Sequence, residues 1–86
     1  MASSMTLHTK IKHFILQNYL FSNDDSLLGD GDSLMQKGIV DSTGVLELVM
    51  HLEEQYGIKI MDEEMIPTNL DSVASIVAFV ERKQAA

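Results

Sequence analysis

The stretch GIVDSTG at residues 38–44, followed directly by VLELVM at residues 45–50, decides how this chain folds. A loop rich in Asp and Gly ends here, and an apolar pattern of helical period begins. Asp41 and Ser42 can each cap a helix, because their side-chain oxygens accept hydrogen bonds from the free N–H groups of a first turn. The Ser42 hydroxyl is therefore expected on the rim of a helix N-terminus, where backbone N–H groups and the helix dipole favour a phosphate. A plain helix cap would explain the same pair.

The helix that starts here is expected to span about Ser42 to Tyr56 and to stop at Gly57. At about 100° per residue, one stripe of this helix carries its core side chains, which are Val45, Leu48, Val49, Leu52 and Tyr56. A second set lies on a different side and comprises Leu46, Glu47, Met50, Glu53 and Glu54. Two interpretations of this side stay open. Another helix of the bundle covers it, or it is a partner surface with an apolar centre and an acidic rim.

The other helices follow from the same kind of pattern. Apolar residues at three- and four-residue spacing predict a first helix from Thr6 to about Tyr19. After an extended link at 58–60 and one turn at 62–66, Thr68 and Asp71 resemble a capping box that starts a short third helix. Asp71 or Ser72 then caps a last helix, whose apolar stripe is Val73, Ile76, Val77 and Val80. The predicted fold class is all-α, a small four-helix bundle of three main helices and one short helix, with a long first loop.

Residues 22–41 form that long loop, in which five apolar residues are expected to pin the chain to the bundle: Leu27, Leu28, Leu34, Ile39 and Val40. The acids of the loop do not match the spacing of an EF-hand, which leaves only loose, weak cation binding open. No metal site is predicted. His8, His13 and His51 are interpreted as surface residues rather than ligands.

Composition bounds the class of function. Thirteen acidic and six basic residues give a net charge of −7, which argues against nucleic acid or an anionic membrane surface as partner. Seven of these acids and a single base fall within residues 41–64, a local balance of −6. That concentration suggests a docking surface for basic partners, although solubility alone would also explain it. With no cysteine in the chain, thioester chemistry would need a thiol from a prosthetic group.

The 86 residues are expected to form one domain. Residues 1–5 are interpreted as a disordered N-terminus of the kind that cloning adds, residues 6–83 as the folded domain, and residues 84–86 as a tail. No stretch reaches the roughly 18 apolar residues of a membrane span, and no signal-peptide pattern is present. A soluble cytoplasmic protein is therefore expected, and it is expected to be a monomer.

An ordered set of short motifs extends well beyond the Asp-Ser pair. It runs DSL at 32–34, GIVDS at 38–42, EL at 47–48, LEE at 52–54, YGI at 56–58, Ile60 and DEE at 62–64. In order and spacing this set resembles the acyl carrier protein family, and the resemblance covers roughly residues 6–83.

The resemblance implies that Ser42 bears 4′-phosphopantetheine, attached from coenzyme A by a phosphopantetheinyl transferase. The thiol of this group would carry acyl thioester intermediates between partner enzymes, as in fatty acid or related lipid or polyketide biosynthesis. These partners would be ligases, synthases or transferases with basic docking patches. The residues implied in partner binding are Asp41, Leu46, Glu47, Met50, Glu53 and Glu54.

The chain departs from the fatty-acid carriers directly after the serine. Thr43 stands where those carriers usually have Leu, and Gly44 is common in aminoacyl- or D-alanyl-type carriers. The acidic second helix, in contrast, favours the fatty-acid type. One alternative is therefore an aminoacyl or D-alanyl carrier served by a dedicated adenylating ligase. A second alternative is an unmodified helical adaptor that binds basic partners through residues 41–64.

Two further expectations concern the same helix. Glycine in a helix costs up to about 1 kcal/mol relative to alanine, so Gly44→Ala is expected to raise the thermal midpoint. No catalytic residue is predicted, because a serine nucleophile needs a base within hydrogen-bond reach and His51 lies more than two turns from Ser42. The protein is thus expected to be a non-catalytic carrier that another enzyme modifies.

Overall fold

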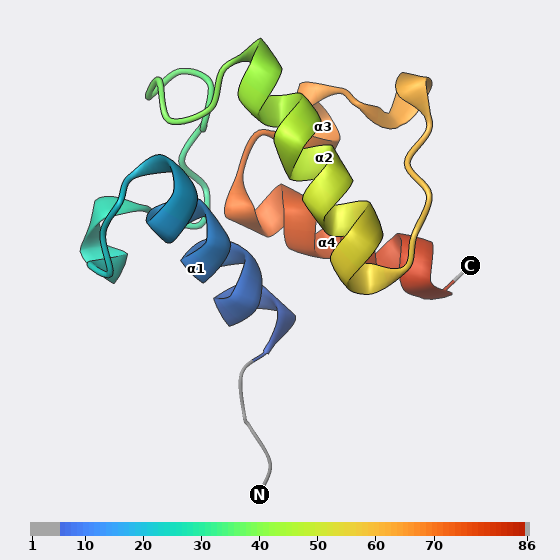
Figure 1. Ribbon diagram of the computed structural model, residues 1–86, viewed down its shortest axis with the longest axis horizontal. Helices are drawn as coiled ribbons and strands as arrows, with labels where there is room; N and C mark the ends of the chain where they lie inside the picture. The colour runs from blue at the N-terminus through green and yellow to red at the C-terminus, as the bar shows by residue number, and fades with distance from the viewer. Residues whose placement is uncertain (1–5, 86) are drawn as a thin grey trace, which may run out of the picture.

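The computed structural model describes residues 6–85, which form the all-α bundle that the sequence predicts (Figure 1). Its helices are α1 (Leu7–Tyr19), α2 (Ser42–Tyr56), α3 (Pro67–Leu70) and α4 (Val73–Ala85). Two short 3₁₀ turns accompany them, η1 (Asp25–Leu27) in the long loop and η2 (Asp62–Glu64) before α3. The expectation for residues 1–5 lies outside the described part of the chain. Helix α4 continues through Ala85, into the stretch that the sequence sets apart as a tail.

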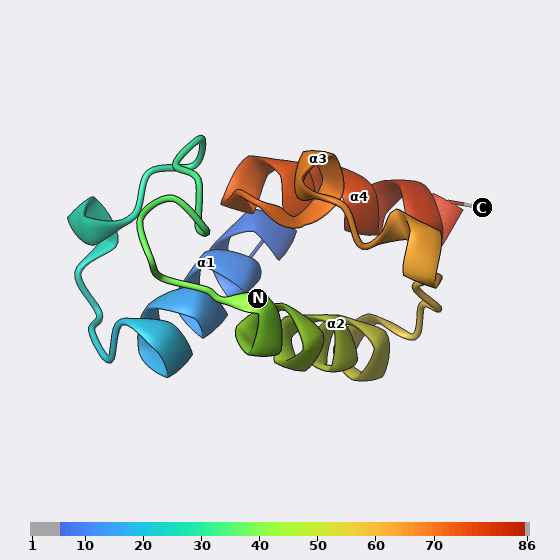
Figure 2. The same ribbon diagram turned by 90° about the horizontal axis from the view of Figure 1, so that it is seen from above.

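Helix α4 holds the bundle together, because it packs against α1, α2 and α3. Figure 2 shows α2 on one side of the molecule and α4 with α3 on the other. The core side chains of the three long helices are Ile11, Ile15, Leu16, Leu48, Val49, Leu52, Val73, Ile76, Phe79 and Val80. Each contributes about 1.5–3 kcal/mol by leaving water. The apolar stripes predicted for these helices are thus largely the buried ones, and Leu16 and Phe79 add to them.

The ends of the long helices follow from local chemistry. The Thr6 side chain accepts a hydrogen bond from the Thr9 N–H at 3.1 Å and so caps α1. Helix α2 ends at Gly57, whose left-handed backbone (φ +65°) confirms the predicted stop. At the start of α4, the Ser72 hydroxyl accepts from the Ser75 N–H at 3.1 Å. Of the two candidates for this cap, Ser72 is therefore the residue that serves.

The predicted start of the short helix is wrong. Helix α3 begins at Pro67, with Ile66 flanking it, rather than after a Thr68 cap. Proline suits this first position because its fixed φ is helical and its missing N–H would have no partner there. Asp71 ends α3 instead of completing a capping box. Its carboxylate accepts from the Ser33 hydroxyl and, at 2.9 Å, from the Met35 N–H, so it holds the long loop.

The long loop packs on the bundle mainly through Leu28, Leu34 and Val40, which are 1%, 1% and 3% exposed. Ile39 packs partly against the same core. The expectation for Leu27 is wrong, since its side chain is 49% exposed. Leu27 lies in the η1 turn, and the next residue, Leu28, takes the inward direction instead.

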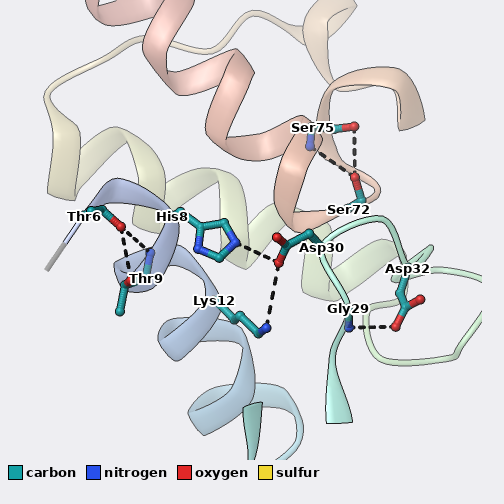
Figure 3. Close-up of polar contacts among 9 residues, drawn as sticks. All are labelled: Thr6, His8, Thr9, Lys12, Gly29, Asp30, Asp32, Ser72 and Ser75. Atoms are coloured by element: carbon teal, nitrogen blue, oxygen red, sulfur yellow. Dashed lines mark hydrogen bonds and ion pairs between the residues drawn. The ribbon is translucent and has the colours of Figure 1, made fainter. Parts of the chain in front are cut away.

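Asp30 joins three parts of the fold. Its carboxylate lies 2.7 Å from His8 Nε2 and 3.8 Å from Lys12 Nζ, both on α1 (Figure 3). Its backbone carbonyl accepts from the Ala74 N–H of α4 at 3.0 Å. The hydrogen bond from His8 is the main reason that the pKa of Asp30 lies below its usual value. The loop is thereby tied to the first and last helices at one point.

Candidate functional site

Ser42 is the first residue of α2, and its side chain is exposed. Asp41 is the cap, with its Oδ1 accepting from the Gly44 N–H at 2.7 Å. Among residues 6–85, no hydrogen bond involves the Ser42 hydroxyl. The structure therefore places this hydroxyl at the rim of a 15-residue helix, as the sequence predicts, and leaves it open to substitution.

An apolar groove of about 280 Å³ opens beside Ser42, between the start of α2 and α3. Its lining residues are Met35, Ser42, Val45, Leu46, Met65, Ile66, Pro67, Leu70 and Asp71. No pattern in the sequence predicted this groove. Its walls come from segments far apart in the chain, and no local pattern shows that they meet. Only Ser42 and Leu46 were already candidates.

The side of α2 away from the core is exposed. Leu46 and Met50 are 55% and 67% exposed, so neither α3 nor α4 covers them. Glu47 and Glu54 are also exposed and lie beside them on the helix. We call Leu46, Glu47, Met50 and Glu54 the outer face of α2. It combines an apolar centre with carboxylates, next to Ser42.

The two other residues predicted to bind a partner enzyme, Glu53 and Asp41, each accept a hydrogen bond from the backbone of this chain. Glu53 is half-buried, and its Oε2 accepts from the Ile60 N–H at 2.9 Å. Its carboxylate thereby anchors the link that follows α2. Asp41 is exposed but serves as the helix cap. Both remain predictions as partner-binding residues, each with a structural task of its own.

The expectation that His51 is a surface residue is only partly right, because the ring is half-buried against α1. It stacks on the Phe14 ring with centroids 3.6 Å apart and an interplanar angle of 7°. Burial lowers the pKa of His51 below its ordinary value of 6.5, an effect that Glu54 partly opposes. The long-range partner Phe14 could not be found from the helical pattern of α2 alone.

Sequence reasoning also missed Tyr19, the last residue of α1. Its hydroxyl donates to the Gly44 carbonyl at 2.9 Å, which brings the end of α1 against the first turn of α2. Gly44 itself is buried. Gly44 is thus a contact between two helices, which bears on the expectation that Gly44→Ala raises the thermal midpoint.

The part of the chain that the structure describes contains no cluster of three or more residues able to hold a metal ion. Nor is any helix there long and apolar enough to cross a membrane. The candidate site therefore consists of the exposed Ser42, the apolar groove beside it and the outer face of α2 with its carboxylates.

Comparison with known proteins gives relatives over most of the chain. It is 33% identical to an acyl carrier protein of Akkermansia muciniphila, over 95% of this chain and 98% of the relative. An acyl carrier protein of Bdellovibrio bacteriovorus is 29% identical, over 92% and 96% of the two chains. A D-alanyl carrier protein of Streptococcus pyogenes is 37% identical, over 78% and 84%. No family model matches the sequence.

Proposed function

Because this chain belongs to the acyl carrier protein family, we propose that it carries a covalently bound cargo on a 4′-phosphopantetheine arm attached to Ser42. The observation that supports this most directly is the exposed Ser42 hydroxyl, which has no hydrogen bond within residues 6–85 and stands at a helix N-terminus. The dipole of that helix favours a phosphate there. When bound, the arm would supply the thiol for a thioester, which the cysteine-free chain lacks.

The residues around Ser42 fit such a group. The hydroxyl can be substituted without breaking a contact of the fold, and the groove beside it offers apolar walls. Asp41 keeps the helix start formed through its bond to the Gly44 N–H. These residues present and orient the serine. The transferase, a separate enzyme, would supply the chemistry of attachment with coenzyme A as donor.

Intact mass after incubation with coenzyme A, Mg²⁺ and a phosphopantetheinyl transferase tests this proposal. The wild-type protein should gain the mass of one phosphopantetheine group. Ser42→Ala should keep the fold, because Asp41 rather than Ser42 caps α2, and should gain nothing. A modified Ser42→Ala protein would refute the assignment. An unmodified wild-type protein would favour the helical adaptor instead.

We further propose that the outer face of α2 docks basic partner enzymes. Its apolar centre is exposed, and its carboxylates can steer a positive surface toward Ser42. Reversing two charges together, Glu47→Lys with Glu54→Lys, should slow loading by the transferase about tenfold, while added salt should slow the wild type. The control is Asp25→Lys with Glu81→Lys, an equal charge change at two exposed residues outside α2. If both double variants slowed loading equally, the rate would depend on the net charge of the protein and not on the outer face of α2.

The cargo distinguishes two versions of this function. A fatty-acyl cargo is supported by the apolar groove beside Ser42 and by relatives that are acyl carrier proteins. A D-alanyl cargo is supported by Gly44 after the serine and by the relatives of that name. Offering the arm-bearing protein to an acyl ligase and, separately, to a D-alanine-adenylating ligase would separate the two. The mass gained in each reaction identifies the cargo.

A further inference from the structure

Gly44, two residues after Ser42, is held on three sides. Its N–H donates to Asp41 Oδ1 at 2.7 Å, and its carbonyl accepts from the Tyr19 hydroxyl at 2.9 Å. A side chain at Gly44 would have its Cβ only 3.3 Å from Tyr19 Cε1 and 3.2 Å from Val40 Cγ1. The tyrosine ring therefore lies against the backbone of this turn. A residue larger than glycine would crowd the ring and require it to shift by a few tenths of an ångström.

Tyr19 is itself held in place by neighbouring rings. Its ring meets Phe14 edge-on, with centroids 6.0 Å apart at 80°, and Phe14 in turn stacks on His51 of α2. Burial, followed by the charges of Glu47 and Asp41, raises the pKa of Tyr19 above its ordinary value of 10.0. The hydroxyl consequently stays protonated at neutral pH and remains a hydrogen-bond donor.

We infer that Tyr19 is a positioning residue for Ser42, and that its contacts with Gly44 fix the first turn of α2 and thereby the place and direction of the Ser42 Cα–Cβ bond. This inference rests on the proposed function. The Ser42 side chain is exposed, and within residues 6–85 its hydroxyl has no hydrogen bond, so the backbone of the turn alone sets the direction in which the side chain leaves the helix. Group transfer is sensitive to such orientation, since a misplaced reacting atom loses much of the rate.

The test compares one substitution at the two tyrosines of the chain. Tyr19→Phe keeps the ring and removes the hydroxyl. Tyr56→Phe is the matched control: Tyr56 is also half-buried, lies at the other end of α2, and has no hydroxyl hydrogen bond within the described residues. Gly44→Ala is a second variant, which keeps the hydroxyl but crowds the ring.

The first readout is amide hydrogen exchange of residues 43–46 in the unmodified protein. Tyr19→Phe should speed exchange there about threefold to tenfold, as the loss of one hydrogen bond implies. Gly44→Ala should speed exchange in the same turn, while Tyr56→Phe should leave it unchanged. Uniformly faster exchange across the domain in Tyr19→Phe would overturn the inference, because the hydroxyl would then only stabilise the fold.

The second readout is steady-state loading by the transferase. Tyr19→Phe should lower kcat about threefold to tenfold and leave KM unchanged, since the outer face of α2 is intact. An unchanged kcat, or an equal loss in Tyr56→Phe, would overturn the inference while leaving the proposed function in place. Absence of loading in the wild type would instead refute the proposed function and, with it, the role of Tyr19 toward a transferase.

Discussion

The two faces of α2 carry similar side chains in opposite environments. Leu48 on the inner face is 0% exposed and Leu46, two residues earlier, is 55% exposed. Val49 and Met50 differ in the same way, at 3% and 67%. Folding explains the inner pair, because these side chains are part of the buried core. It does not explain the outer pair, and exposed apolar residues rimmed by carboxylates are typical of surfaces that bind a partner.

The largest expected effect is a difference in the free energy of unfolding between variants of Leu48 and Leu46. Leu48→Ala should lower the free energy of unfolding by about 3 kcal/mol, because it leaves a cavity in the core. The identical change at Leu46, and likewise Met50→Ala, should shift it by less than about 0.5 kcal/mol. Urea unfolding of the unmodified proteins measures both. A large loss for Leu46→Ala or Met50→Ala would mean that the outer face belongs to the core.

The same two outer-face variants should affect loading. If the outer face docks the transferase, Leu46→Ala and Met50→Ala should raise the KM for loading severalfold although their stability is unchanged. Normal loading kinetics in both variants would show that the outer face, although exposed, does not dock the transferase.

A smaller effect is expected at Gly44, where the inner side of α2 begins. Alanine would gain up to about 1 kcal/mol of helix propensity. Its Cβ, however, would stand 3.2–3.3 Å from Val40, Asp41 and Tyr19. Crowding of this kind typically costs about 1–3 kcal/mol, so Gly44→Ala should lower the thermal midpoint modestly. This reverses the expectation from sequence.

Gly31→Ala is the control for Gly44→Ala, since a Cβ at Gly31 meets nothing within 4 Å. That variant should have a midpoint at or slightly above the wild-type value. A raised midpoint for Gly44→Ala would restore the sequence-based expectation and show that the Tyr19 ring can shift to accommodate a Cβ at little cost.

The smallest effect concerns His51, which lies between the two faces. Burial depresses its pKa in the folded state, so the unfolded chain binds a proton more readily. The free energy of unfolding should therefore decrease as pH falls below the ordinary histidine value of 6.5. His51→Phe keeps an aromatic ring against Phe14 but cannot titrate. Its stability should consequently decline less than that of the wild type between about pH 7.5 and 5.5, as measured by urea unfolding.

Much of the fold could be predicted because it depends on local signals. Period and caps gave α2 its limits, Ser42 and Tyr56, and Gly57 its role as a stop. The misassignments were of another kind. Thr68 and Asp71 have the spacing of a capping box, yet Pro67 starts α3 and the Asp71 carboxylate is taken by the long loop. The competing partner lies nearly forty residues away, where no local pattern could reveal it.

The same distinction between local signals and long-range contacts applies to the candidate site. The sequence alone determined that a serine stands exposed at the start of an acidic amphipathic helix, because capping and helical period act over a few neighbouring residues. Only the tertiary structure decided that Met35, Met65 and Leu70 meet beside this serine as a groove, and that Tyr19 closes on Gly44. The physical reason is that such contacts depend on how complete helices and loops pack together, and packing joins residues whose separation in the chain carries no signal of their proximity.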